Sequence, residues 1–321
     1  MALYIARRLL WAGLVILVVL MIVFAVFYLL PASDPALRFA GKSPTPESLA
    51  LIRDRLGLDE PWWKQYAIFV KNFVAGDEYG WPGLGYSFTG NVSVLSEVTE
   101  RAPRTLFLIA GAAIIWLVVG VSIGVLSAVK RQSAADRAAM GFVLIGISSP
   151  VFWLGLMALW VFWKKLGWTG GTGYVPITES PTAFFSHMIL PWTVLALLFA
   201  AIYARMTRNS LLDTLGEDYI RTARAKGLPE RTVIFRHGLR ASLAPIITMF
   251  GMDIALLVGG AIITESVFNI QGLGWLAIDS TLNQDLPTVV GVVVVGAVAV
   301  VVMNLIVDIG YAFLDPRVRY E

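Results

Sequence analysis

The run LLWAGLVILVVLMIVFAVFYLL, residues 9–30, decides the fold class, because it holds 22 residues without one charged side chain. A helix needs about 20 apolar residues to cross the hydrocarbon core of a bilayer. A secretory signal peptide is the alternative interpretation, since Arg7 and Arg8 precede the run. The apolar part of a signal peptide is only about 7–15 residues long, and no clear cleavage site follows this run. The sequence therefore predicts an uncleaved membrane anchor.

Similar runs recur along the chain and predict an all-α membrane protein with six transmembrane helices, because a helix satisfies its own backbone hydrogen bonds in lipid. The five further runs are residues 105–129, 138–163, 188–204, 241–264 and 286–307. The run at 188–204 is the shortest, and the run at 241–264 contains one charged residue, Asp253. The prediction divides the chain into a first helix with its N-terminal residues (1–30), an extramembrane segment (31–104) and a transmembrane core (105–321).

The composition supports this class and excludes several others. Charged residues make up 15% of the chain, against about 25% in soluble domains. The chain has no Cys and only two His, His187 and His237, so we expect neither disulfides nor a metal site. The net charge is +3, but its placement is explained by membrane orientation, so nucleic acid is not expected as a partner.

The distribution of Lys and Arg predicts that both termini lie in the cytoplasm, because short cytoplasmic loops are rich in these residues. The connection between the fourth and fifth runs, residues 205–240, carries eight of them, whereas the connection between the fifth and sixth runs carries none. The segment 31–104 holds eight basic and nine acidic residues. The rule does not apply to long loops, so the charge of this segment does not contradict its placement on the extracytoplasmic side of the membrane.

The outer segment is predicted to contain two short helices. Thr45 and Pro46 suit a helix start, with Gly57 closing that helix. Residues 61–74 predict a second helix that ends at Gly76. Its apolar face comprises Trp62, Tyr66, Phe69 and Phe73. Such a face either packs on the protein or lies at the membrane surface, and the sequence leaves both open.

The loop at 205–240 is predicted to contain a helix of its own. Residues 217–226, EDYIRTARAK, begin with acidic and end with basic side chains, which complements the helix dipole. Gly227 suits a C-terminal cap, and Pro229 prevents continuation. Residues 231–239 predict a second short helix leading back to the membrane. This compact protrusion favours docking to a partner protein, and a solvated basic loop is the alternative.

Residues 219–228, YIRTARAKGL, and 236–245, RHGLRASLAP, resemble the EAA loop of binding-protein-dependent ABC importers. The general motif has Glu-Ala-Ala where this chain has Arg-Thr-Ala at 221–223, a substitution that is usual in the peptide and nickel branch. Further segments resemble that branch, namely residues 29–35 (LLPASDP), 265–274 (ESVFNIQGLG) and 304–317 (NLIVDIGYAFLDPR). The large outer segment is similar to that of the first of the two permease subunits in dipeptide, oligopeptide and nickel systems.

The resemblance implies a permease subunit of an ATP-driven importer in a bacterial-type cytoplasmic membrane, translocating di- or oligopeptides. Its implied partners are a second homologous permease subunit, two ATPase subunits, an extracytoplasmic substrate-binding protein and the lipid bilayer. The resemblance also implies a coupling helix that contacts the ATPase. The expected coupling residues are Glu217, Asp218, Tyr219, Ile220, Arg221, Thr222, Ala223, Arg224, Ala225, Lys226 and Gly227.

The chain itself is expected to be no enzyme and to carry no cofactor, with ATP and Mg on the partner subunits. Residues 36–43, ALRFAGKS, resemble a phosphate-binding loop, but Pro44 and Pro46 stand where its helix would begin. Import of nickel chelates or other small solutes by the same architecture is the alternative function. A secondary transporter is a further alternative but fits the sequence less well, because we find no convincing internal repeat.

Four polar residues in or near the apolar runs are candidate pathway or gate residues, because intramembrane carboxylates are costly and often functional. They are Asp253, Glu265, Asn304 and Asp308. Asp253 either lines the pathway or pairs with a neighbour. For Asp308, the position near the cytoplasmic end of its run favours a role as a structural hydrogen-bond partner. Glu265 is predicted at the outer mouth, as a gate or a contact for the binding protein. An intramembrane aspartyl protease would use paired acids, but Gly251-Met252-Asp253 lacks the Gly-x-Gly-Asp order of that family.

Overall fold

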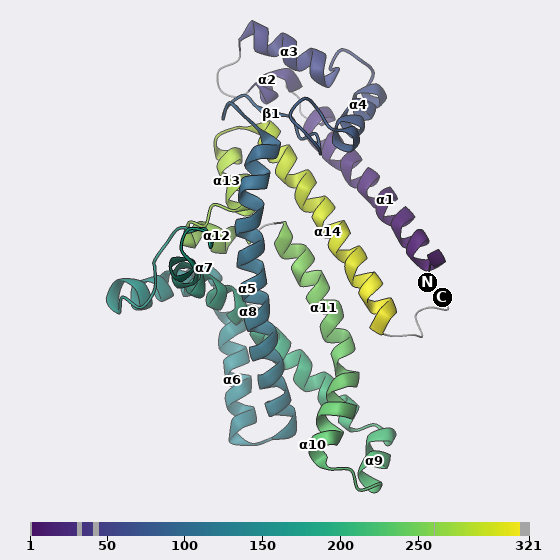
Figure 1. The fold of residues 1–321 in the computed structure, drawn as a ribbon, viewed down its shortest axis with the longest axis vertical. Helices are drawn as coiled ribbons and strands as arrows, with labels where there is room; N and C mark the ends of the chain where they lie inside the picture. The colour runs from purple at the N-terminus through teal and green to yellow at the C-terminus, as the bar shows by residue number, and fades with distance from the viewer. Residues whose placement is uncertain (1, 31–33, 41–44, 260, 315–321) are drawn as a thin grey trace. The chain divides into compact units, whose positions relative to one another are not determined.

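The computed structural model describes residues 2–30, 34–40, 45–259 and 261–314 (Figure 1). In these residues the chain is mostly helical, with one small sheet. Contacts divide it into two compact units. The first comprises residues 1–106, 255–266 and 270–321, and the second comprises residues 107–254 and 267–269.

Within the described residues, five helices are long and apolar enough to cross a membrane, or six if one bent pair is counted as a single span. The spans cover residues 5–29, 94–129, 181–215, 230–258 and 286–306, and the bent pair covers 134–148 with 151–165. The predicted all-α membrane class is confirmed, and the predicted number of six holds when the bent pair counts once.

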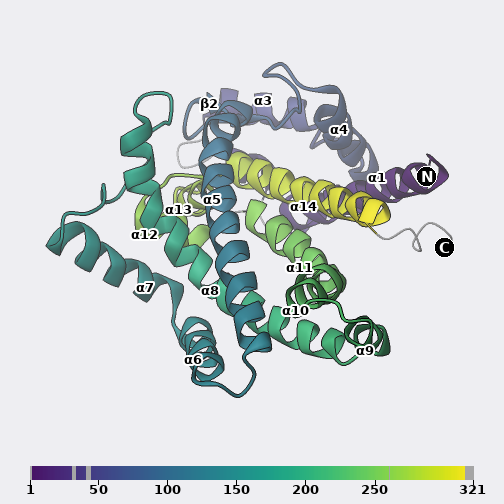
Figure 2. The same ribbon diagram turned by 60° about the horizontal axis from the view of Figure 1, so that its bottom comes forward.

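The third predicted run, residues 138–163, is wrong as one continuous helix. It divides into α6 (Ala134–Ser148) and α7 (Val151–Ala158), which a π-helical stretch, Leu159–Lys165, extends. The helix axis bends by 102° between the two parts, a bend that Figure 2 shows clearly. The cause is Pro150, which lacks an N–H and keeps the preceding residue, Ser149, in an extended conformation (φ −91°, ψ 125°). Hydropathy does not detect the bend, because both residues are uncharged.

The predicted edges of the fourth and fifth runs also need correction. α8 (Pro181–Leu215) is 35 residues long, about twice its apolar run at 188–204. It begins where Ser180 Oγ accepts a hydrogen bond from the N–H of Ala183 (3.3 Å). The run at 241–264 divides into two helices, α11 (Arg240–Val258) and α12 (Ile262–Phe268).

In the first unit, α1 (Ala2–Phe24), continued by the π-helical stretch Ala25–Leu29, lies beside α14 (Leu286–Leu314) (Figure 1). Three short helices follow α1, and α13 lies against α14. These helices are α2 (Pro35–Phe39), α3 (Pro46–Leu56), α4 (Trp62–Ala75) and α13 (Leu273–Leu282). The shared core contains Leu20, Phe24, Tyr28, Phe39, Ile52, Val290 and Val294.

Both helices predicted in the segment 31–104 are present in the structure. Thr45 caps α3 by accepting a hydrogen bond from the N–H of Ser48 (3.1 Å), and Gly57 ends it with a φ of +61°. The apolar face of α4 packs on the protein, and Tyr66 donates a hydrogen bond to the carbonyl of Leu17 in α1 (2.7 Å). Trp62 does not take part, because its side chain is exposed.

A two-stranded antiparallel hairpin connects the outer segment to the long helix α5 (Val94–Val129). Its strands are β1 (Tyr86–Ser87) and β2 (Val92–Ser93), with Tyr86 opposite Ser93. The hydroxyl of Ser87 donates a hydrogen bond to Asp285 (2.6 Å), which also accepts one from the hydroxyl of Thr288 (2.7 Å). This buried cluster attaches the hairpin to the start of α14.

In the second unit, α5 and α8 approach closely through small residues. A Cβ on Gly120 would lie 2.9 Å from the carbonyl oxygen of Ala200, and one on Gly124 would lie 2.6 Å from that of Ala204. Only glycine fits at such distances. α8 also packs against α6 and α7.

Candidate functional site

The loop after α8 folds as the sequence predicts. The predicted helix at 217–226 is α9 (Asp218–Ala225), one residue shorter at each end. Gly227 then turns the chain with a φ of +75°. The second predicted helix consists of α10 (Glu230–Thr232) and a π-helical stretch, Val233–Leu239, that runs directly into α11 (Figures 1 and 2).

One face of α9 is buried against its own loop. Ile220 and Ala223, three residues apart, point to the same side of the helix and pack against Val233, with Leu215 at the edge of the cluster. Ile220 and Val233 are completely buried. Burying a side chain of this size contributes about 1.5–3 kcal/mol, which holds α9 in place.

An ion pair closes the turn at Gly227. The Nη2 of Arg224 donates to one carboxylate oxygen of Glu230 at 2.8 Å, and its Nε donates to the other at 3.2 Å. Both side chains are partly exposed, and such a pair contributes only about 0–1 kcal/mol. It sets the geometry of the turn more than its stability.

The opposite face of this loop is exposed and combines apolar and basic side chains. The exposed fractions of the large apolar side chains Tyr219, Leu228 and Phe235 are 47%, 38% and 52%. The exposed basic side chains of the same loop are Arg221, Arg224, Lys226, Arg231, Arg236 and Arg240. Exposed apolar groups rimmed by polar ones are typical of protein interaction surfaces.

The base of the loop is attached tightly to α8. A Cβ on Gly238 would lie 3.1 Å from both Leu211 and Leu215, so the returning chain contacts α8 closely. The hydroxyl of Ser210 donates to the carbonyl of Ser242 (3.1 Å) in α11. α9 is therefore connected to the ends of two long helices by packing and hydrogen bonds.

A buried ion pair attaches α8 to α6 shortly before α8 ends. The Nε and Nη2 of Arg208 donate to the two carboxylate oxygens of Asp136 at 2.8 and 3.0 Å. Asp136, which is 5% exposed, also accepts hydrogen bonds from the Ser127 hydroxyl and the N–H of Gln132 (2.9 Å for the latter). Sequence reasoning misses this pair, because both residues lie beside basic loops where charges are ordinarily solvated.

Of the candidate pathway residues, Asp253 is paired. It accepts a hydrogen bond of 2.7 Å from the Tyr203 hydroxyl, which joins α11 to α8. Tyr203 is fully buried and lies next to Trp116 of α5. The geometry thus matches the interpretation in which Asp253 pairs with a neighbour.

Glu265 lies in the first unit, where it is 0% exposed. Its carboxylate accepts hydrogen bonds from the Thr105 hydroxyl (2.7 Å) and the N–H of Trp275 (2.9 Å). Thr105 in turn accepts one from the N–H of Leu273 (2.8 Å). Burial raises the pKa of Glu265, and these hydrogen bonds oppose the rise. A carboxylate buried in this way offers no surface to a binding protein, so the geometry favours a structural role.

The remaining candidates lie on α14 in the first unit. Asn304 is exposed, and the side chain of Asp308 lies outside the described residues. The residues that the structure describes contain no group of three or more His, Asp or Glu side chains that could hold a metal ion.

Comparison with known proteins places this architecture in a family. Residues 120–320 match the family described as binding-protein-dependent transport system inner membrane component, and residues 1–109 match its N-terminal counterpart. A putative peptide transport system permease protein of Brucella abortus is 38% identical over 317 residues, which cover 99% of both chains. A dipeptide transport system permease protein of Alkalihalophilus pseudofirmus is 35% identical over 337 residues, and a glutathione transport system permease protein of Escherichia coli O6:H1 is 37% identical over 319, again with 99% of each chain covered. The chain therefore belongs to the inner membrane components of binding-protein-dependent transport systems, the multi-pass permease subunits of ABC importers.

Proposed function

We propose that this subunit translocates peptides delivered by an extracytoplasmic binding protein, and that α9 and the turn after it form the contact with the ATPase subunits. The observation that carries the proposal is the loop from Glu217 to Leu239, with one face anchored on α8 and the other exposing apolar and basic side chains. The coupling residues are those from Glu217 to Gly227.

The anchoring explains how a movement of the ATPase reaches the transmembrane helices. A force on the exposed side of α9 is transmitted through Ile220 to Val233, and so to the start of α11. The close packing of Gly238 on Leu211 transmits it to α8 as well. Helices that pack closely transmit strain, because protein interiors are hardly compressible.

The remaining partners follow from the family. A second homologous permease subunit completes the pathway, and two ATPase subunits bind ATP and Mg. Both termini and the α9 loop lie in the cytoplasm, with the outer segment on the other side of a bacterial cytoplasmic membrane. Large apolar side chains exposed on α1, among them Leu10, Trp11 and Ile22, support direct contact with the lipid bilayer.

The names of the relatives favour peptides over nickel chelates as the cargo. The three relatives described above are named as peptide, dipeptide and glutathione transport permeases. Glutathione is itself a small peptide. The binding protein selects the cargo in such a system, so the permease contributes the path and the coupling.

The test is a charge reversal on the exposed face of α9. In proteoliposomes with the complete transporter, we expect Arg221→Glu to abolish ATP-dependent dipeptide uptake while the subunit still inserts into the membrane. Arg131→Glu, at an exposed basic position in the turn between α5 and α6, is the matched control and keeps uptake. Normal uptake and normal ATPase stimulation by the Arg221→Glu transporter would refute the docking surface.

Peptide specificity needs a separate measurement. Competition of labelled dipeptide uptake by unlabelled peptides, and by a nickel chelate, identifies the cargo class. We expect the peptides alone to compete.

A further inference from the structure

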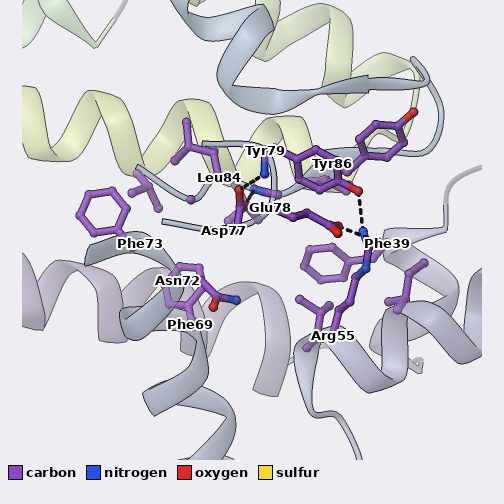
Figure 3. A pocket seen from close by; sticks show the side chains of 18 of the residues that line it. Phe39, Arg55, Phe69, Asn72, Phe73, Asp77, Glu78, Tyr79, Leu84 and Tyr86 are labelled. Atoms are coloured by element: carbon purple, nitrogen blue, oxygen red, sulfur yellow. Dashed lines mark hydrogen bonds and ion pairs between the residues drawn. The ribbon is translucent and has the colours of Figure 1, made fainter. Parts of the chain in front are cut away.

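A cavity of about 330 Å³ lies within the first unit, between the π-helical stretch after α1, α2, α3, α4, the hairpin region and the start of α14 (Figure 3). This volume is within the range of small-molecule sites, about 300–1,000 Å³. Its walls are mainly aromatic and aliphatic. They include Tyr28, Phe39, Ile52, Phe69, Phe73 and Val290.

The cavity lies where two spanning helices leave the membrane. Tyr28 belongs to the last turn of the span at residues 5–29, and Val290 and Val294 belong to the first turns of the span at residues 286–306. Pro287 and Gly291 also line it from that second span, and the remaining lining residues come from the segment 39–88, outside the spans. One part of the cavity is therefore at the depth of the hydrocarbon, and the other is at the depth of the lipid headgroups.

Polar groups of both signs gather at the headgroup part. Arg55 donates to the Tyr79 hydroxyl (2.6 Å) and pairs with Glu78 at 2.5 Å, as the dashed lines in Figure 3 show. A guanidinium has five N–H donors, so Arg55 keeps donors for a further acceptor. The carboxylate of Glu78 is half-exposed, so it has room to pair with a second cation.

The cavity has two other polar side chains, and only one of them has hydrogen-bond partners in the part of the chain that the structure describes. Asp77 accepts hydrogen bonds from the N–H groups of Tyr79 and Gly85, both at 2.8 Å. The side-chain amide of Asn72 has no hydrogen-bond partner among the described residues, although it lines the cavity. Asn72 is half-buried, and its amide can donate to or accept from a ligand in the cavity.

We propose that this cavity binds a zwitterionic aminophospholipid, with one acyl chain among the aromatic side chains and the headgroup at Arg55 and Glu78. The phosphate accepts from Arg55, whose planar donors suit it, and the ammonium pairs with Glu78. Asn72 contributes a further hydrogen bond to the ester region. The lipid would thereby join the outer segment to α1 and α14, a role separate from peptide transport.

The experiment uses the complete transporter in nanodiscs of phosphatidylethanolamine and phosphatidylglycerol, with a trace of phosphatidylethanolamine carrying a diazirine in its acyl chain. After illumination, mass spectrometry locates the crosslinks. We expect them in residues 46–75 and 286–298, and we expect extra unlabelled phosphatidylethanolamine to suppress them more than phosphatidylglycerol does.

Variants test the two parts of the cavity separately. Val290→Phe fills the apolar part, and we expect crosslinking to fall about tenfold. Val302→Phe adds the same ring to the same helix at an exposed position and leaves crosslinking unchanged. Glu78→Gln removes the partner of the ammonium and with it the preference for phosphatidylethanolamine over phosphatidylglycerol, whereas Glu60→Gln, at an exposed ion pair beside α4, retains it.

Three results would overturn the proposal. One is an equal yield of crosslinking to the two segments in the Val290→Phe and Val302→Phe transporters, provided that both have the same thermal stability. Another is an unchanged lipid preference in Glu78→Gln. A third is labelling of these segments by a photoactivatable dipeptide, suppressed by unlabelled dipeptide, which would make the cavity a peptide site. Dipeptide uptake measured in the same nanodisc preparation after transfer to liposomes tests the transport function independently.

Discussion

Arg208 and Asp136, 72 residues apart in the chain, form a bidentate ion pair with distances of 2.8 and 3.0 Å. The pair joins the first turn of α6 to α8, shortly before α8 reaches the α9 loop. The Ser127 hydroxyl and the N–H of Gln132 complete the coordination of the carboxylate. The charge on Asp136 is thus fully compensated although the side chain is buried.

Removing one partner of this pair is expected to be costly. Arg208→Met leaves a buried carboxylate without a counter-charge, which destabilises the protein by about 3–5 kcal/mol. The double variant Asp136→Leu with Arg208→Met removes both charges and is expected to recover part of this loss. The measurement is the thermal unfolding midpoint of each variant in detergent. A double variant less stable than Arg208→Met would contradict a direct interaction.

The turn at Gly227 is expected to tolerate few residues. Its φ of +75° costs a branched side chain about 1–2 kcal/mol, although a Cβ there would meet nothing within 4 Å. Gly227→Val is therefore expected to lower ATP-driven uptake through the backbone alone, and Gly227→Asn, which adopts this conformation more readily, is expected to retain most of it. Equal uptake by both variants would argue against a role for the conformation.

The bond between Tyr203 and Asp253 distinguishes pairing from a pathway role. If Asp253 serves mainly as an acceptor for Tyr203, Asp253→Asn keeps the hydrogen bond through its amide oxygen and keeps uptake near the wild-type rate. Tyr203→Phe leaves a partly buried carboxylate without its donor and is expected to destabilise the protein by about 1–3 kcal/mol. Uptake and thermal stability are measured for both. Loss of uptake in a stable Asp253→Asn protein would assign the charge to the pathway.

Glu265 is expected to make stability depend on pH. Because burial raises the pKa of this carboxyl, the folded protein binds its proton more tightly than the unfolded chain. Its contribution to stability is greatest below the ordinary glutamate pKa of about 4.3 and falls as the pH rises through the raised pKa. We expect Glu265→Gln to flatten this dependence in thermal unfolding from acidic to neutral pH.

The control for this measurement is Glu100→Gln, at an exposed position of α5, which is expected to follow the wild-type curve. If the plots of thermal stability against pH for the wild type and Glu265→Gln run parallel from acidic to neutral pH, Glu265 is not the cause of the pH dependence. Thr105→Val provides a second test, because it deletes a hydrogen bond to the carboxylate and is expected to destabilise the protein most at neutral pH.

Local signals explain what could be predicted from the sequence. Thr45, Gly57 and Gly227 set helix ends through contacts within one turn, and such contacts involve only neighbouring residues. The number of apolar runs likewise follows from composition along the chain. The helix α9 could be predicted from the order of its residues, because an acidic start and a glycine after its end are both local features.

The tertiary structure decided which residues are partners. Hydropathy could not detect the bend at Pro150, since an uncharged proline does not interrupt an apolar run. It also could not pair Arg208 with Asp136 or Tyr203 with Asp253, because these pairs depend on which faces of two helices meet. The buried contacts of Glu265 have the same origin, since the donor Thr105 lies 160 residues away in the chain. The sequence by itself determined a multi-pass membrane protein with a helical loop after its fourth apolar run, and helix packing determined the buried polar contacts that hold its parts in place.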